Sequence, residues 1–272
     1  MVPENKVKRL VDIIKSMEKV AVAFSGGVDS TLLAAAAKKA LGDKAVLATA
    51  CSESSSRREK EDAAALAKLL GVEHVWLPGG EMACPDFVAN SKERCYYCKK
   101  VRFGALVAWA KARGIEWVIE GTNTDDKGDY RPGLRAIAEL SAVRSPLLEA
   151  GFSKSEIRAL SRDWNLPTWD KPSAACLVSR LEYGLPITPE RLRQVEAAEE
   201  VVRRYCSGQV RVRHHDALAR IEVFPPEVAK VAEPETAAAV SAELKKLGFS
   251  FVAVDLVGYR TGSMNELLDE VQ

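Results

Sequence analysis

Short, mostly apolar runs alternate with longer helical segments along the first part of the chain. Residues 20–24 are apolar throughout, which is typical of a strand buried on both faces of a parallel sheet, and we expect further strands at 45–51, 74–77 and 117–120. Apolar spacing, strong helix formers and caps predict helices at 6–19, 31–41, 57–70, from about 100 to 113, and after the capping box of Ser153 and Glu156. Because strand and helix alternate, the sequence predicts an α/β fold with a doubly wound parallel sheet.

The pattern changes near residue 170. A proline and several small residues in 171–180 favour a loop. Beyond it we expect a helix over 188–205, a pair of strands over 210–223, a helix over 235–247 and a strand over 251–257. We therefore expect two domains, residues 1–170 and a smaller α+β domain of residues 171–272.

Composition and charge indicate which kinds of molecule the protein can bind. The chain has 39 basic and 38 acidic residues, so its net charge of +1 gives no electrostatic funnel for a polyanion. We expect a small-molecule substrate and no nucleic acid. No apolar stretch reaches the length of a membrane helix, and the first residues lack the apolar core of a signal peptide. We expect a cytoplasmic protein without a membrane partner.

A glycine turn joins the first expected strand to the helix after it. The turn reads Ser25-Gly26-Gly27-Val28-Asp29-Ser30, so the backbone can turn sharply where the first N–H groups of the helix point outward. Phosphate is the natural ligand there. Ser25 and Ser30 can add hydroxyl hydrogen bonds, and Asp29 can hold magnesium or position the loop. Neither GxxxxGK[ST] nor GxGxxG is present.

A second polar loop begins at Gly121, directly after the strand expected at 117–120. Carboxyl ends of parallel strands meet at one edge of a sheet, so we expect this loop beside the first, with Gly121 permitting close approach to a nucleotide. Asp125 and Asp126 either face magnesium or form an Asx turn without a ligand.

Cys95 and Cys98 form a C-x-x-C pair with basic neighbours. The pair fits half of a zinc site, a redox dithiol or part of an iron–sulfur site, and the spacing alone does not decide among them. Cys51 and Cys84 have no nearby partner at ligand spacing, which indicates structural thiols.

Arg211 and Arg213 alternate with apolar residues, so their side chains leave one face of a strand about 7 Å apart. Two guanidinium groups at that distance can clamp a phosphate. A solvated strand face is the other interpretation of this pattern.

Longer segments carry a family resemblance. SGGVDS at 25–30 resembles the PP-loop of the HUP-like ATP pyrophosphatases, which split ATP into AMP and pyrophosphate. KPSAACLVSR at 171–180, RVRHHDALARIEV at 211–223 and the segments EGTNTDD, DYRPG and SPLLE resemble the LarE family of sulfur transferases. That resemblance implies ATP and Mg²⁺, a pyridinium-3,5-biscarboxylic acid mononucleotide as substrate, and a homo-oligomer such as a hexamer. The carboxylates would be adenylated and converted to thiocarboxylates in nickel-pincer cofactor biosynthesis.

The resemblance also assigns roles to single positions. It implies a catalytic role for Asp29 and for Cys176, which matches the sulfur cysteine of the family. The nucleotide would lie on Ser25, Gly26, Gly27, Asp29 and Ser30, with Gly121 beside them. The substrate pocket would contain Ser179, Arg180, Glu199, Arg211 and Arg213, with the arginines on the substrate phosphate.

Two sulfur chemistries occur in the family. In one, a single cysteine gives up its own sulfur and becomes dehydroalanine; in the other, three cysteines hold a [4Fe–4S] cluster that carries a sulfide. Because this chain has Cys95 and Cys98 besides Cys176, we expect the cluster, fed by sulfide or another sulfur donor. The alternatives are a sacrificial Cys176, a tRNA thiolase, and a non-enzymatic ATP-binding or zinc-stabilised protein that uses Cys84 as a fourth ligand.

Overall fold

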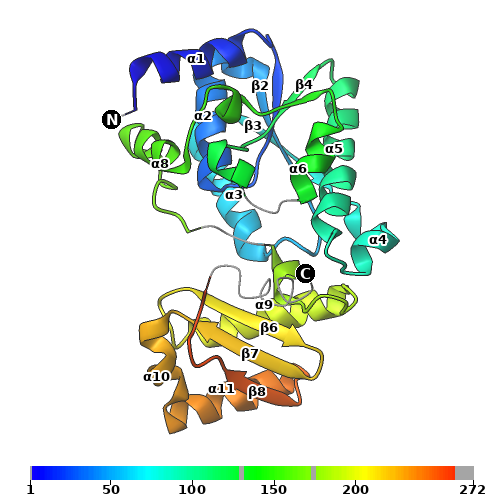
Figure 1. The fold of residues 1–272 in the computed structure, drawn as a ribbon, viewed down its shortest axis with the longest axis vertical. Helices are drawn as coiled ribbons and strands as arrows, with labels where there is room; N and C mark the ends of the chain where they lie inside the picture. Colours follow the sequence, from blue (N-terminus) through cyan, green and yellow to red (C-terminus); the bar gives the residue numbers. More distant parts are fainter. Residues whose placement is uncertain (1, 129–131, 173–175, 261–272) are drawn as a thin grey trace. The chain divides into compact units, whose positions relative to one another are not determined.

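The computed structural model describes residues 2–128, 132–172 and 176–260. Contacts between residues divide the chain into two compact units (Figure 1). The first contains Met1–Phe87 and Glu93–Ala174, and the second contains Val88–Lys92 and Ala175–Gln272. No helix in the described part of the chain is long and apolar enough to cross a membrane.

The first unit is built on a parallel sheet with the strand order β3-β2-β1-β4-β5. Its strands are β1 (Val20–Ala23), β2 (Ala45–Cys51), β3 (Glu73–Pro78), β4 (Trp117–Ile119) and β5 (Val143–Arg144). The expected α/β fold with a parallel sheet is confirmed, and β5 is an addition too short to leave a pattern in the sequence. From β1 the chain builds β2 and β3 on one side and β4 on the other, so the strand order reverses between β1 and β4. In such sheets ligands bind at this reversal, outside the carboxyl ends of the strands.

Helices cover both faces of the sheet (Figure 1). Alternate residues of β1 show why, because Val20 and Val22 belong to one apolar cluster and Ala21 to the other. The first cluster includes side chains of α1 (Glu4–Lys15), α2 (Val28–Leu41), α3 (Arg57–Leu70), α7 (Pro146–Glu149) and α8 (Lys154–Asp163). The second includes side chains of α5 (Arg94–Ala112) and α6 (Pro132–Ala138), and the short α4 (Pro85–Val88) precedes α5.

The second unit contains a three-stranded mixed sheet in the order β6-β7-β8. Its strands are β6 (Val210–His215), β7 (Leu218–Val223) and β8 (Phe251–Val254), and its helices are α9 (Pro189–Arg203), α10 (Val228–Ala232) and α11 (Pro234–Lys246). Strands β6 and β7 are antiparallel, whereas β7 and β8 are parallel because α10 and α11 connect them. The α+β character expected of this region is confirmed.

A short segment of the first half of the sequence belongs to the second unit. Within Val88–Lys92, the Asn90 side-chain amide donates to the carbonyl oxygens of Glu182 and Leu185, both at 2.8 Å. Nothing in the sequence pattern indicates this excursion. The domain boundary expected after residue 170 stays a prediction, and the contacts change unit after Ala174.

Candidate functional site

The glycine turn between β1 and α2 uses its two glycines differently. Gly26 has a φ of +68°, and a Cβ there would lie 3.2 Å from the Cα of Ala63 on α3, so only glycine fits without strain. Gly27 has an ordinary φ of −81°, and a Cβ there would meet only the Ser25 hydroxyl, at 3.4 Å. The fold therefore requires Gly26, while the space at Gly27 stays open toward solvent or a ligand.

The start of α2 has no side-chain cap. Its N-cap is Gly27, which has no side chain to accept from the first N–H groups, whereas Ser56 and Ser153 cap α3 and α8. The hydroxyl oxygens of Ser25 and Ser30 lie 3.1 Å apart, and the Ser30 hydroxyl donates to the carbonyl of Gly27 at 3.2 Å. A shaped loop with open N–H donors at the positive end of a helix is an anion site.

Asp29 lies in the first turn of α2, next to Gly121. A Cβ at Gly121 would lie 3.0 Å from the Cβ of Asp29 and 3.3 Å from the main-chain nitrogen of Ser30, so the loop after β4 reaches the first loop as expected. The Oδ2 atom of Asp29 accepts from the Lys154 ammonium. Its Oδ1 atom is buried and has no hydrogen-bond partner among the described residues. A buried carboxylate oxygen with open lone pairs suits a magnesium ion.

Two lysines that the sequence analysis did not single out contact this loop. Lys154 starts α8 and pairs with Asp29. Lys171 donates to the carbonyl oxygen of Gly26 at 3.1 Å and to Asp62 of α3 at 2.8 Å. Both lie more than a hundred residues from the loop in sequence, so no local pattern could have identified them.

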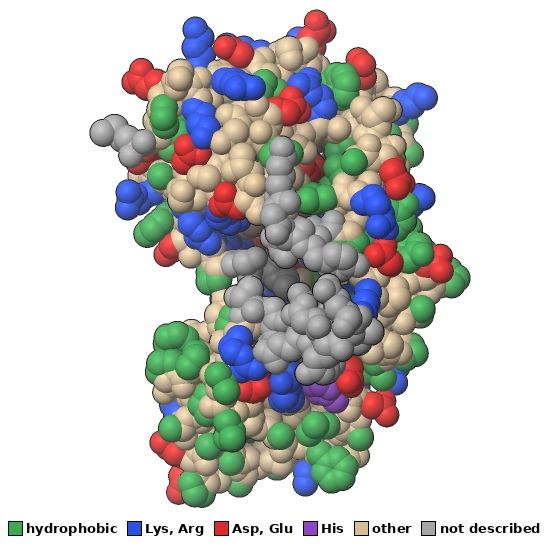
Figure 2. All heavy atoms as spheres, in the orientation of Figure 1, with side chains coloured by type: hydrophobic (Ala, Val, Ile, Leu, Met, Phe, Trp, Pro, Cys, Tyr) green, Lys and Arg blue, Asp and Glu red, His purple; other side chains and the backbone are tan. Residues whose placement is uncertain are grey.

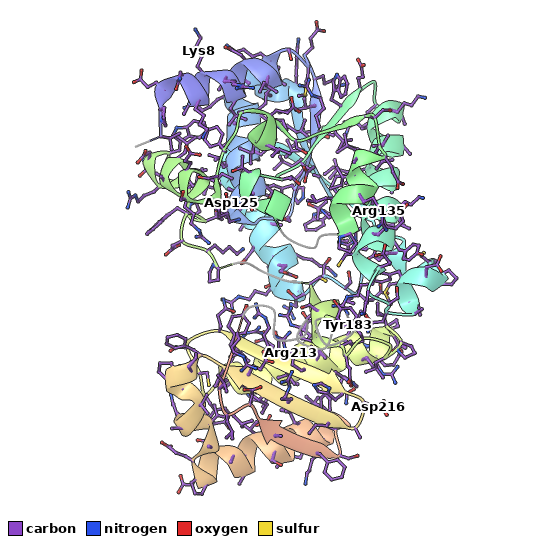
Figure 3. All side chains as sticks on the ribbon, viewed as in Figure 1. Lys8, Asp125, Arg135, Tyr183, Arg213 and Asp216 are labelled. Carbon is purple, nitrogen blue, oxygen red and sulfur yellow. The ribbon has the colours of Figure 1, made fainter. Side chains whose placement is uncertain are left out.

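The carboxylates of the loop after β4 hold the chain in place. Asp126 accepts from the main-chain N–H of Asn123 at 2.9 Å, and Asp125, labelled in Figure 3, accepts from the main-chain N–H of Lys154 at 3.0 Å. The Asx turn itself is made by Asn123, whose side-chain oxygen accepts from the main-chain N–H of Asp125 at 3.0 Å. Because both aspartates already accept from main-chain N–H groups, the structure favours a turn over a magnesium site at either residue.

Cys95 and Cys98 lie in the first turns of α5, three residues apart and therefore on one face of the helix. Cys95 is exposed and Cys98 is half-buried. Two thiols on one helix face fit part of a metal or cluster site. Within the residues that the structure describes, no group of three or more His, Cys, Asp or Glu side chains is arranged to hold a metal ion. Cys176, the third expected ligand, belongs to the second unit.

In the second unit, Cys176 is exposed and its main chain is held by its neighbours. Its carbonyl oxygen accepts from the Ser179 hydroxyl at 2.8 Å and from the Arg180 guanidinium at 3.0 Å. Arg180 also donates to Glu199 of α9 at 2.8 Å, and both side chains are buried. Burial alone would raise the pKa of Glu199, but Arg180 and Arg203 hold it below its usual value. Glu199 is thus a charged anchor for Arg180.

Arg211 and Arg213 on β6 are only 6% and 5% exposed, which excludes a solvated strand face. Arg213, labelled in Figure 3, pairs with buried Glu222 of β7 at 2.6 Å. Arg211 donates to the carbonyl oxygen of Val210 at 2.8 Å. No carboxylate among the described residues pairs with Arg211, and burial followed by the nearby Arg180 lowers its pKa. Glu199 offsets part of this charge at longer range, and the Tyr259 ring lies 5.3 Å from the guanidinium. Buried guanidinium groups gathered around so few carboxylates favour an anionic ligand.

Comparison of the sequence with known proteins gives one matching family model and several similar proteins. A sequence model described as NAD synthase matches residues 4–84, which include the glycine turn. An uncharacterized protein of Synechocystis sp. is 42% identical, over 97% of this chain and 98% of that protein. The pyridinium-3,5-bisthiocarboxylic acid mononucleotide synthase of Lactiplantibacillus plantarum is 37% identical, over 98% of this chain and 96% of that protein. The tRNA-specific 2-thiouridylase of Xanthobacter autotrophicus is 27% identical, over 74% of this chain and 60% of that protein.

Identity over nearly the whole length joins this chain to the Lactiplantibacillus plantarum synthase, and the chain also has the strand, glycine turn and uncapped helix of a nucleotide site. The chain belongs to the LarE family of ATP-dependent PP-loop sulfur transferases.

Proposed function

We propose that this protein adenylates the carboxylates of pyridinium-3,5-biscarboxylic acid mononucleotide and converts them to thiocarboxylates in nickel-pincer cofactor biosynthesis. Arg211 carries the proposal, because it is a buried guanidinium that forms no direct ion pair with a carboxylate of the described residues and has Glu199 only at longer range. With Arg180 and Arg213 nearby, it makes a cationic pocket suited to the phosphate of a mononucleotide. The activity named for the Lactiplantibacillus plantarum relative supports the same substrate.

In the first half of the reaction, the open N–H groups of α2 and the hydroxyls of Ser25 and Ser30 would hold the phosphates of ATP. Gly27 leaves room for close approach of the nucleotide, and Gly121 lets the loop after β4 pack against Asp29 and Ser30. Asp29 would hold magnesium, which neutralises phosphate charge when bound. A substrate carboxylate oxygen attacks the α-phosphorus of ATP, and the bond to pyrophosphate breaks. The products are an acyl-adenylate and pyrophosphate.

In the second half, a sulfur nucleophile attacks the acyl carbon and AMP leaves with the electron pair of the broken C–O bond. Cys176 is exposed, so its thiol can hold the group that carries this sulfur, and Ser179 and Arg180 fix its main chain. Because Glu199 is shared by Arg180 and Arg203, we assign it a positioning role instead of contact with the reacting atoms.

We infer that the sulfur is presented by a [4Fe–4S] cluster held by Cys95, Cys98 and Cys176. The support is chemical: two thiols on one helix face, a third exposed thiol and no need for the pair in a sacrificial enzyme. Such a cluster leaves one iron without a protein ligand, where an external sulfide can bind.

Anaerobic purification followed by iron, sulfide and zinc analysis tests the sulfur source. We expect about four iron and four sulfide per chain. Replacing any one of the three cysteines with alanine should remove iron and sulfur transfer, while adenylation continues and is seen as pyrophosphate release. The matched control is Cys206→Ala, which changes a buried thiol in the core of the second unit. Mass spectrometry after turnover gives the opposing outcome: a loss of about 34 Da at Cys176, the mass of hydrogen sulfide, would establish the sacrificial route.

A tRNA thiolase is the second candidate, because the Xanthobacter autotrophicus relative is a tRNA-specific 2-thiouridylase. The charge of the chain argues against it. On the face drawn in Figure 2, acidic side chains are interspersed among the basic ones of the first unit, and the net charge of the chain is +1. AMP release stimulated by the mononucleotide and not by tRNA would support our proposal, and the reverse would overturn it. A homo-oligomer and a cytoplasmic location remain expectations for sizing and fractionation experiments.

A further inference from the structure

The loop that would hold the phosphates of ATP contains no cationic side chain. Its sequence from Ser25 to Ser30 has no lysine or arginine, in contrast to the GxxxxGK[ST] loop, whose lysine contacts phosphate. Positive charge must therefore reach the phosphates from elsewhere. In the described residues Lys154 and Lys171 bring ammonium groups to this loop, and they contact different groups in it.

The two lysines differ in what they hold. Lys171 contacts the Gly26 carbonyl and Asp62, while the main-chain oxygens of Trp169 and Lys171 accept from Arg158 at 2.8 and 2.9 Å. These bonds fix both the main chain and the ammonium group of Lys171. Lys154 contacts Asp29, the side chain to which we assign magnesium. The Lys154 ammonium group and a bound magnesium ion would therefore compete for the same carboxylate.

The main chain at Lys154 is held by several hydrogen bonds, whereas its side chain reaches the loop through the single ion pair with Asp29. Its N–H donates to Asp125, and the preceding Ser153 forms a capping box with Glu156. Thr124 donates twice to the carbonyl oxygen of Phe152, at 2.9 and 3.0 Å. The ammonium group thus stands on a fixed base at the end of a flexible side chain that is 33% exposed.

Asp29 cannot bind the Lys154 ammonium group and a magnesium ion equally strongly at the same time. Its Oδ2 atom accepts from Lys154 and its Oδ1 atom is buried without a hydrogen-bond partner among the described residues. A divalent ion at this carboxylate would repel the ammonium group at close range. The nearest large negative charge for a displaced ammonium group would then be the phosphate chain of the nucleotide on the same loop.

We propose that Lys154 exchanges partners during the reaction. Before magnesium and ATP bind, Lys154 is the counter-ion of Asp29 and keeps this carboxylate oriented. Once Asp29 takes its metal ion, Lys154 turns to the phosphate chain and stabilises the negative charge that develops on the leaving pyrophosphate. Lys154 thereby supplies the cation that the loop lacks. The inference rests on the proposed cleavage of ATP, but its first half concerns metal binding alone.

The test compares Lys154→Met and Lys154→Arg with the matched control Lys6→Met. Lys6 of α1 pairs at 2.6 Å with Glu156, which lies on α8 as Lys154 does. The Lys6 side chain is similarly half-buried, but it does not contact the loop. Mn²⁺ binding without nucleotide is followed by electron paramagnetic resonance. Because a competing cation is gone, Lys154→Met should bind Mn²⁺ roughly threefold to fivefold more tightly than wild type. Lys154→Arg and Lys6→Met should bind it as wild type does.

The second readout is pyrophosphate release at saturating Mg²⁺. Lys154→Met should lose kcat on the order of a hundredfold with a small change in KM for ATP. Lys154→Arg should retain most of the rate because it keeps the charge. Unchanged Mn²⁺ affinity in folded Lys154→Met would overturn the exchange, as would an equal loss of rate in Lys6→Met. The Mn²⁺ titration needs no mononucleotide, so it separates failure of this inference from failure of the proposed substrate.

Discussion

Replacing Arg211 with methionine should weaken binding of the mononucleotide without destabilising the fold. Methionine keeps most of the apolar stem and removes the charge. The native guanidinium is 6% exposed and is paired with a carbonyl oxygen, not with a carboxylate of the described residues. Buried Glu199, which also feels this charge, keeps its ion pairs with Arg180 and Arg203, so we expect the free energy of unfolding to stay within about 1 kcal/mol of wild type.

The size of the binding loss follows from the contact. A hydrogen bond between a charged donor and a charged acceptor contributes about 2 kcal/mol, so the Kd for the mononucleotide should rise roughly thirtyfold. Binding of ATP should change by less than about threefold, because its proposed site belongs to the other unit. Arg213 offers the contrast: its replacement strips buried Glu222 of its 2.6 Å partner and leaves Arg220 at 3.3 Å. We expect Arg213→Met to cost about 3 kcal/mol of stability.

Calorimetric titration with the mononucleotide and with ATP, together with urea unfolding of each variant, measures all of these quantities. Wild-type affinity for the mononucleotide in Arg211→Met would show that the phosphate binds elsewhere. Equal losses for both ligands would show that the substitution disturbs the protein as a whole. Strong destabilisation of Arg211→Met would mean that this guanidinium has a structural partner.

Three further substitutions test the loop and a buried histidine. Gly26→Ala should lower stability by about 1–3 kcal/mol because of its positive φ and the contact with Ala63, as thermal unfolding would show. Gly27→Val should remain folded yet lose AMP formation by at least about tenfold, and wild-type ATP cleavage in that variant would disprove the phosphate loop. Burial lowers the pKa of His214 to about 4, so its stabilising contribution is complete above pH 6.5 and is lost as the pH falls toward 4. His214→Gln should flatten this dependence in urea unfolding, and an unchanged pH profile would refute the assignment.

Several structural features could be predicted because they are local. The mostly apolar runs correspond to β1, β2, β3 and β4, and β2 and α3 have the expected bounds. The capping box at Ser153 and Glu156 is also present as expected. Each of these depends on residues that are neighbours in sequence, where backbone preference and side-chain periodicity act directly. Short elements such as β5 and α7 carry too few residues to show a period.

Other features depend on contacts across long separations. Lys154 and Lys171 reach the loop from 125 and 145 residues away, and no spacing in the sequence marks either as its neighbour. Asn90 joins the second unit through bonds to residues more than ninety positions later. A sequence pattern cannot rank such contacts, because any of the many lysines in the chain could supply the charge.

By itself the sequence determined the parallel sheet, the glycine turn that starts α2 and the segments that link the chain to the LarE family. All three are written in consecutive residues, where spacing and chain geometry leave few alternatives. The tertiary structure decided which charges are neutralised. It showed Glu199 bound to Arg180, Glu222 bound to Arg213, and no carboxylate of the described residues bound to Arg211. Burial and pairing set the cost of a charge, and both depend on how distant segments pack together.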